Sequence, residues 1–256
     1  MYILAIETTG PFGSVALATE ETFLGKEVST DTMNHLKDLI PMMERLLRRA
    51  EVAKSDLSYV AASVGPGSFT GIRIGVSTAR ALGQALDIPV ISVPTLETFA
   101  YKRAAGERMD QKAETGERPV ICGILNARRG QVYGIIEEFL PGGPYMLTDV
   151  LEIITGKVKE TGRKILFFGD GIDAYEEQII EVLRQASMEP GREFFFAEKE
   201  DRYQDAEAVV RLGLKKVKEG RFLAYDQLHP QYMRKAEAEQ KLEAGQLPIC
   251  KLPPQQ

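Results

Sequence analysis

The order of the expected strands and helices occurs twice along the chain, and this repeat constrains the fold more than any other feature. Apolar runs bounded by turns predict strands, and apolar residues at helical spacing predict helices. The first half reads strand 2–6, strand 14–19, strand 23–28, helix 32–50, strand 57–64, helix 72–86, strand 89–93 and short helix 96–104. The second half reads strand 120–125, strand 131–140, weak strand 145–147, helix 149–160, strand 164–168, helix 173–187, strand 193–197 and helix 205–219.

This order predicts an α/β protein built from two similar units. Parallel strands joined by helices, after an antiparallel hairpin, predict a mixed sheet with helices on both faces. We expect residues 1–104 to form the first unit and residues 119–221 the second, with a polar linker over 105–118. Residues 222–256 form a C-terminal segment that ends in a disordered tail. Two such units in tandem leave a cleft between them.

Composition and charge restrict the kind of protein. The chain carries 32 Lys and Arg against 37 Asp and Glu, a net charge of −5, whereas a stand-alone nucleic-acid binder normally has a basic surplus. No apolar run approaches the roughly 18 residues needed to cross a bilayer, and residues 1–6 lack the basic start of a signal peptide. Cys122 and Cys250 form no C-x-x-C pair, and His35 and His229 share no metal-ligand spacing. We therefore expect a cytoplasmic protein without a membrane segment or a metal site.

The turn after the first strand has the chemistry of a nucleotide site. It contains Glu7, Thr8, Thr9 and Gly10. Carboxylate and hydroxyl oxygens suit a metal ion, and backbone N–H groups suit phosphate. A hairpin turn whose threonine side chains bond their own backbone is the alternative interpretation.

A glycine-rich loop, Gly65–Gly71 with Gly67 inside it, joins a strand to a helix N-terminus. Such a loop offers free N–H groups and the positive end of a helix dipole to an anion. It lacks the Gly-Lys-Ser/Thr ending of a P-loop. Pro66 breaks the G-x-S-x-G pattern, so Ser68 is a poor candidate for a nucleophile. A tight structural turn is the alternative.

Two turns of the second half complete the candidate site. Arg128 and Arg129 lie in the turn 126–130 and suit phosphate, although a solvated turn is the alternative. Asp170, between two glycines, either faces the cleft or caps the following helix. The candidate ligands for ATP or ADP with Mg²⁺ are thus Glu7, Thr8, Thr9, Gly10, Gly67 and Asp170.

Small residues recur along the helix 72–86 and the loop before it, which lets another backbone approach closely. That backbone belongs either to the parent sheet or to another chain, and we expect another chain. The apolar face of the helix 32–50 joins this interface, because methionine suits adaptable surfaces. The predicted interface residues are Met33, Leu36, Ile40, Met43, Leu47, Gly71, Ile72, Gly75, Ala79 and Gly83.

Several blocks of sequence resemble the TsaB (YeaZ) family of tRNA threonylcarbamoyladenosine biosynthesis proteins. The blocks lie at residues 3–8, 63–75, 126–133, 169–171 and 230–234 and span nearly the whole chain. The run G-P-G-S-F-T-G-I-R-I-G at 65–75 is the most specific of them.

The resemblance implies two tandem RNase-H-like subdomains of the actin-like (ASKHA) superfamily, each a mixed sheet flanked by helices. It also implies a role in placing a threonylcarbamoyl group on N6 of the adenosine beside the anticodon of ANN-decoding tRNAs. In that family the catalytic subunit is the paralogue TsaD, which has metal-binding histidines. TsaB is a non-catalytic scaffold that dimerises with TsaD and lets the ATPase TsaE join. By this resemblance we expect no catalytic residue in this chain, a homodimer when it is alone, and tRNA contact mainly through the complex.

Two positions depart from the family. Glu7 and Asn126 stand where the family commonly has Asp, and both changes weaken the expectation of a metal-bound nucleotide. Two rival functions stay open: an ATP-dependent phosphotransferase using Glu7, Thr8, Thr9 and Asp170, and a metallopeptidase, which would have to bind a metal ion.

Overall fold

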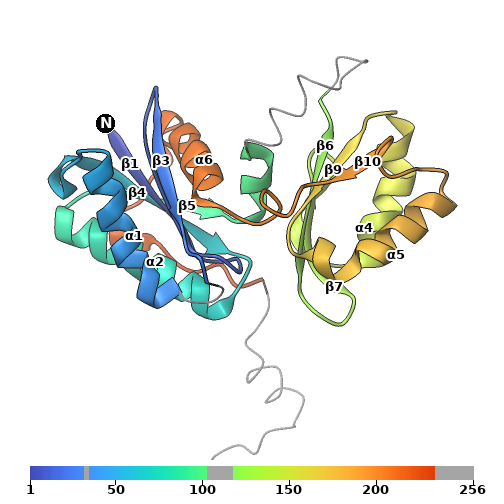
Figure 1. The fold of residues 1–256 in the computed structure, drawn as a ribbon, viewed down its shortest axis with the longest axis horizontal. Coiled ribbons are helices and arrows are strands. Elements are labelled where there is room, and N and C mark those ends of the chain that lie inside the picture. Colours follow the sequence, from blue (N-terminus) through green and yellow to red (C-terminus); the bar gives the residue numbers. More distant parts are fainter. Residues whose placement is uncertain (32–34, 103–117, 234–256) are drawn as a thin grey trace, which may run out of the picture.

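The computed structural model describes residues 1–31, 35–102 and 118–233, and its strands form two five-stranded sheets (Figure 1). In the first sheet the order is β3-β2-β1-β4-β5. Its strands are β1 (Tyr2–Glu7), β2 (Ser14–Thr19), β3 (Phe23–Val28), β4 (Leu57–Gly65) and β5 (Val90–Pro94). The first three strands run antiparallel, and β1, β4 and β5 run parallel.

The second sheet repeats this pattern in the order β10-β9-β6-β7-β8. Its strands are β6 (Val120–Asn126), β7 (Gln131–Ile136), β8 (Leu140–Met146), β9 (Ile165–Phe168) and β10 (Phe194–Phe196). The central strand β6 pairs antiparallel with β7 and parallel with β9, as β1 does with β2 and β4. The predicted duplication of an α/β unit with a mixed sheet is therefore confirmed.

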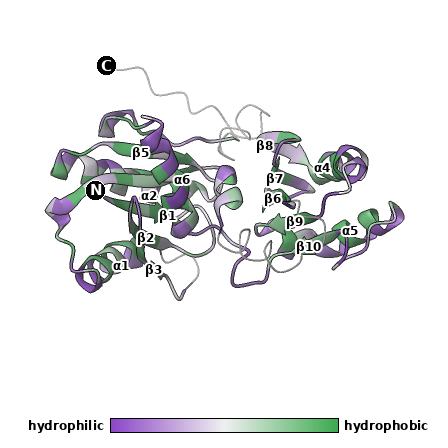
Figure 2. Cartoon of the chain, turned by 90° about the horizontal axis from the view of Figure 1, so that it is seen from above, coloured by the Kyte–Doolittle hydropathy of each residue, from purple (hydrophilic) through white to green (hydrophobic). Residues whose placement is uncertain are grey.

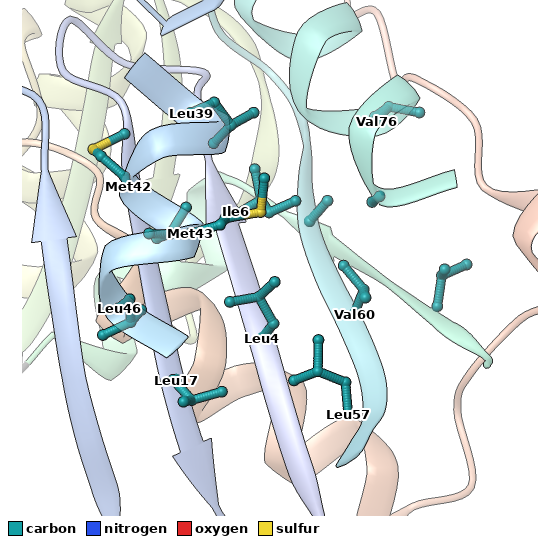
Figure 3. Close-up of a cluster of buried hydrophobic side chains, with 14 of the residues drawn as sticks. Leu4, Ile6, Leu17, Leu39, Met42, Met43, Leu46, Leu57, Val60 and Val76 are labelled. Carbon is teal, nitrogen blue, oxygen red and sulfur yellow. The ribbon is translucent and has the colours of Figure 1, made fainter. Parts of the chain in front are cut away.

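The helices α1 (His35–Arg49) and α2 (Phe69–Leu86) cover one face of the first sheet. Side chains alternate between the two faces of a strand, so Leu4, Ile6 and Leu17 point to these helices. They pack against one apolar stripe of α1, formed by Leu39, Met42, Met43 and Leu46 (Figure 3).

The other face of the first sheet is covered by α6 (Ala206–Lys218), the last helix of the second half. Val209 and Val210 pack on Ile3 and Ile91 there. The prediction that residues 119–221 form one unit is thus wrong for this helix. The face consists largely of alanines, and Gly213 has no side chain, so α6 can approach closely: a Cβ on Gly213 would lie 3.1 Å from Ile3 Cδ1.

The short 3₁₀ helix η2 (Leu96–Tyr101), which follows the first sheet in sequence, packs on the second sheet. Leu96 and Phe99 pack on Ile121 and Phe168 of the second sheet, and η2 also contacts α6. Two helices therefore lie between the sheets, and Figure 2 shows the apolar strands of both sheets flanked by helices. The second sheet is covered on its other face by α4 (Leu147–Ile153), by its continuation as a π-helix, Ile154–Val158, and by α5 (Gly171–Gln185).

Several predicted boundaries differ from the structure. The run 131–140 is two strands, because the chain reverses at Glu138, whose φ is +70°. The helix expected over 96–104 ends at Tyr101. The C-terminal segment includes a short 3₁₀ turn, Tyr225–Gln227, and returns to the first sheet, where Leu223 pairs with Val90 and Leu228 is fully buried.

Most of the predicted linker and the predicted disordered tail, as well as Met33, lie outside the described residues. Within the described ranges, no helix has the length and apolar character that crossing a membrane requires.

Candidate functional site

Glu7 ends β1 with its side chain fully buried. Its Oε1 accepts hydrogen bonds from the Thr9 backbone N–H (2.5 Å) and the Thr9 hydroxyl (2.6 Å). Its Oε2 accepts one from the Ser63 hydroxyl near the end of β4. Burial raises the pKa of Glu7, while these hydrogen bonds oppose the rise. Both carboxylate oxygens are therefore engaged by donors of the chain itself.

The glycine-rich loop lies directly on this turn. The Ser68 N–H donates to the Thr9 carbonyl at 2.8 Å, and Thr8 Oγ1 donates to the Gly71 carbonyl at 2.7 Å. A Cβ on Gly67 would lie 2.5 Å from the Thr9 carbonyl oxygen. Ser68 also caps α2, because its Oγ accepts from the Gly71 N–H at 3.2 Å. The glycines that the sequence analysis considered for phosphate binding thus allow the turn at Thr8 and Thr9 to pack closely on the loop.

Residues 202–205, here called the crossing segment, lead from the second sheet to α6. The first residue of the crossing segment, Arg202, is bound to the second half. The Gly169 N–H donates to the Arg202 carbonyl at 2.8 Å, and the Arg202 guanidinium pairs with Asp173 at 2.5 Å. The Tyr203 hydroxyl donates to Asp173 at 2.8 Å, and its ring lies 5.6 Å from that of Phe12 in the β1–β2 turn.

The end of the crossing segment packs on the first half. Gln204 is 5% exposed, and a Cβ on Gly10 would lie only 2.7 Å from its Oε1. Asp205 pairs with the buried Lys102 ammonium at 2.5 Å. Burial opposes ionisation of Asp205, yet the charge of Lys102 holds its pKa below the usual value. The crossing segment is thus tied to both halves beside the Glu7 turn.

Asp170 belongs to a second polar cluster, at the turn between β6 and β7. Its Oδ1 accepts from the Asn126 N–H at 3.0 Å, and burial raises its pKa. The Asn126 Oδ1 in turn accepts from the Arg128 N–H at 2.8 Å and from the Tyr175 hydroxyl at 3.3 Å. Asp170 occupies the N-cap position of α5, but its side chain makes no capping hydrogen bond. The capping interpretation of its carboxylate is therefore wrong.

The structure thus brings Glu7, Thr8, Thr9 and Gly67 into one cluster and Gly10 against Gln204. Ser63, Lys102 and Gln204 were missed by the sequence analysis. Ser63 lies inside the block 63–75 that resembles the family, two residues before its most specific run, and this position could have indicated it. Lys102 and Gln204 had no such signal, because their partners are about a hundred residues or more away.

The predicted interface residues divide into two groups. Leu36 and Ile40 are exposed on α1, at 77% and 49%. The others within the described residues are buried in the chain's own core: Met43, Leu47, Gly71, Ile72, Gly75, Ala79 and Gly83. The small-residue stripe faces the parent sheet, since a Cβ on Gly71 would lie 1.9 Å from the Thr8 carbonyl oxygen and one on Gly75 2.4 Å from Thr8 Oγ1. The expectation that this stripe meets another chain is corrected accordingly.

A separate cavity of about 500 Å³ lies between η2, the β7–β8 turn and α6. Its walls include Leu96, Ile121, Leu140 and Leu212, and none of the predicted site residues lines it.

Comparison with known proteins defines the class. The TsaD family, tRNA N6-adenosine threonylcarbamoyltransferase, matches residues 29–241. A solved structure of YeaZ from Pseudomonas aeruginosa superposes with a TM-score of 0.64 at 24% identity, covering 90% of this chain and 99% of that one. The fold is an α/β arrangement of two subdomains, each a mixed five-stranded sheet flanked by helices, as in that YeaZ structure.

Curated relatives narrow this class to one family. The chain is 34% identical to the tRNA threonylcarbamoyladenosine biosynthesis protein TsaB of Bacillus subtilis (strain 168), over 94% of this chain and 97% of that protein. It is 32% identical to the TsaB protein of Buchnera aphidicola subsp. Schizaphis graminum (strain Sg), over 66% of this chain and 78% of that protein. The chain belongs to the TsaB (YeaZ) family, as its sequence blocks predicted.

Proposed function

We propose that this chain acts in tRNA threonylcarbamoyladenosine biosynthesis as a non-catalytic subunit that holds and activates a TsaD-type transferase, together with a TsaE-type ATPase. Family membership supports the pathway, because curated relatives are named for it. The non-catalytic role rests on one observation: both oxygens of Glu7 are bonded to Thr9 and Ser63. A carboxylate so engaged has little capacity left for a metal-bound nucleotide.

The crossing segment supports the same role. Gln204 packs against Gly10, where a nucleotide held by the first turn would need space. The rival phosphotransferase needs that turn open, so it requires Gln204 to move and Glu7 to exchange its partners.

The proposed partner surface is the exposed side of α1 and α2. Leu36 and Ile40 project from α1, and Arg73, Ser77 and Ala81 lie at every fourth position on the exposed side of α2. Exposed aliphatic side chains beside small ones suit a helix of another chain, because burying each large side chain contributes about 1.5–3 kcal/mol. The same surface would join two copies of this chain when the partner is absent.

The direct test is threonylcarbamoyl transfer to tRNA by TsaD-type and TsaE-type proteins, with and without this chain. We expect modified adenosine only when the chain is present. Equal rates without it would refute the scaffold role, and titration of Mg-ATP against the chain would then test the phosphotransferase.

The surface is tested with the double variant Leu36→Glu/Ile40→Glu. Both side chains are exposed, so the monomer should stay folded while transfer activity and complex mass by light scattering fall, activity by at least about tenfold. Phe222→Glu, at a 44% exposed apolar residue whose ring packs on Tyr59, is the control and should change neither. Full activity of the double variant would show that the partner binds elsewhere.

A further inference from the structure

The turn between β6 and β7 holds two arginines in an unusual backbone conformation. Arg128 and Arg129 have φ of +66° and +54°, and Gly130 follows at +74°. The Gln131 N–H closes the turn on the Arg128 carbonyl at 3.0 Å. Arg129 and Gly130 are therefore the central residues of a β-turn, 128–131, within a three-residue hairpin loop. Both have positive φ, a conformation that Asn-Gly normally occupies. Residues with a Cβ are disfavoured there.

Hydrogen bonds from the second half stabilise this conformation. The Asn126 Oδ1 accepts from the Arg128 N–H, and the Tyr175 hydroxyl accepts from the Gly130 N–H at 3.2 Å while it donates to Asn126. Asp170 holds the Asn126 N–H. The turn is thus a fixed platform, and its shape does not depend on the arginine side chains.

The two guanidinium groups differ from the other arginines of this half. Arg163, Arg184 and Arg202 each pair with a carboxylate. Arg128 and Arg129 are both exposed, and neither guanidinium has a hydrogen bond or ion pair among the residues that the structure describes. Two adjacent cations thus stand at a costly backbone position without a charge partner among the described residues. Strained positions of this kind are typical of functional sites.

We propose that Arg128 and Arg129 form a phosphate-binding site for the backbone of the tRNA substrate. This inference rests on the proposed function and goes beyond it. The guanidinium fork matches phosphate geometry. The rest of the chain gives RNA no general attraction, since its net charge is −5. Contact with RNA must therefore be local, and this pair of exposed cations on a fixed turn meets that need. An acidic surface on a protein partner is the competing occupant, which the test separates.

The test measures tRNA binding by the complex of this chain with its TsaD-type partner at several salt concentrations. For Arg128→Ala/Arg129→Ala we expect about tenfold weaker binding. The negative slope of log K against log salt should become less steep, by about 0.7–0.9 for each phosphate that the variant no longer neutralises. Arg184→Ala/Arg192→Ala removes the same charge from the same half and should leave both quantities nearly unchanged.

A third variant separates a binding role from a structural one. Arg129→Asn places a residue that favours positive φ in the turn, so we expect a higher melting temperature together with weaker tRNA binding. A merely structural arginine would leave tRNA binding unchanged.

Two results would overturn the proposal. One is unaltered tRNA affinity and salt slope in Arg128→Ala/Arg129→Ala. The other is loss of the partner from that variant by light scattering, which would assign the arginines to a protein interface. Both outcomes are independent of the omission assay, so failure here leaves the scaffold role standing.

Discussion

Glu7 shows how a single buried carboxyl can affect the stability of the first half. Its folded pKa is raised above the ordinary value of 4.5, chiefly by burial. The folded state then holds its proton more tightly than the unfolded state. The free energy of unfolding is therefore largest below the unfolded pKa, decreases as the pH rises from 4.5 through the folded pKa, and levels off above it.

Replacing Glu7 by Gln should remove this dependence. The amide can still accept from Thr9 and can donate to Ser63, but it carries no charge to desolvate. We expect Glu7→Gln to melt at a higher temperature than the unmodified chain near pH 8, with the difference shrinking toward pH 4.5. Thermal melts across that range measure it, and Glu21→Gln, at an exposed turn, is the control. A constant difference at all pH values would contradict the burial argument.

At the scale of the element, α2 illustrates why a stripe of small residues is ambiguous in sequence. Small residues at every fourth position of a helix indicate that another segment packs closely there, but they do not show which segment it is. In the structure the neighbour is the β1 turn, since the Thr8 carbonyl oxygen fills the place of a Gly71 side chain. A large side chain at Gly75 would therefore disturb the monomer itself, since an added Cβ would lie 2.4 Å from Thr8 Oγ1.

Two Gly-to-Ala changes should move stability in opposite directions. Gly71→Ala forces α2 away from β1 and should cost about 1–3 kcal/mol. For Gly156, in the π-helical turn after α4, no described residue lies within 4 Å of an added Cβ, so Gly156→Ala should gain about 0.5–1 kcal/mol. Urea unfolding of both variants measures the difference. Equal stabilities would mean that α2 is not seated as closely as described.

At the scale of the whole molecule, each half contributes a helix that packs on the sheet of the other half. Helix α6 completes the core of the first sheet although it follows the second sheet in sequence. The Lys102 ammonium anchors the entry to α6, because it binds both Asp205 and the Tyr203 carbonyl. Neither half has a complete core alone.

Lys102→Met should weaken this join. It leaves the largely buried Asp205 carboxylate without its cation, and removing one partner of a buried pair costs about 3–5 kcal/mol. The double variant Lys102→Met/Asp205→Asn should recover most of the loss, since no charge is left unpaired. Urea unfolding of the two variants measures the recovery. If the double variant is as unstable as the single one, the pair does not act as an anchor.

The sequence by itself determined the duplicated order of strands and helices, the mixed sheets and the family. These follow from local periodicity, turn residues and the specific block 65–75, all readable within a few neighbouring positions. The tertiary structure alone decided where α6 and η2 pack, which side of Gly71 is filled, and that Glu7 is bonded to Thr9 and Ser63. Those contacts join residues that are distant along the chain, such as Glu7 with Ser63 or Ile3 with Val209. Periodicity shows that a face is buried, but the surface that packs against it is decided by the tertiary packing of distant segments.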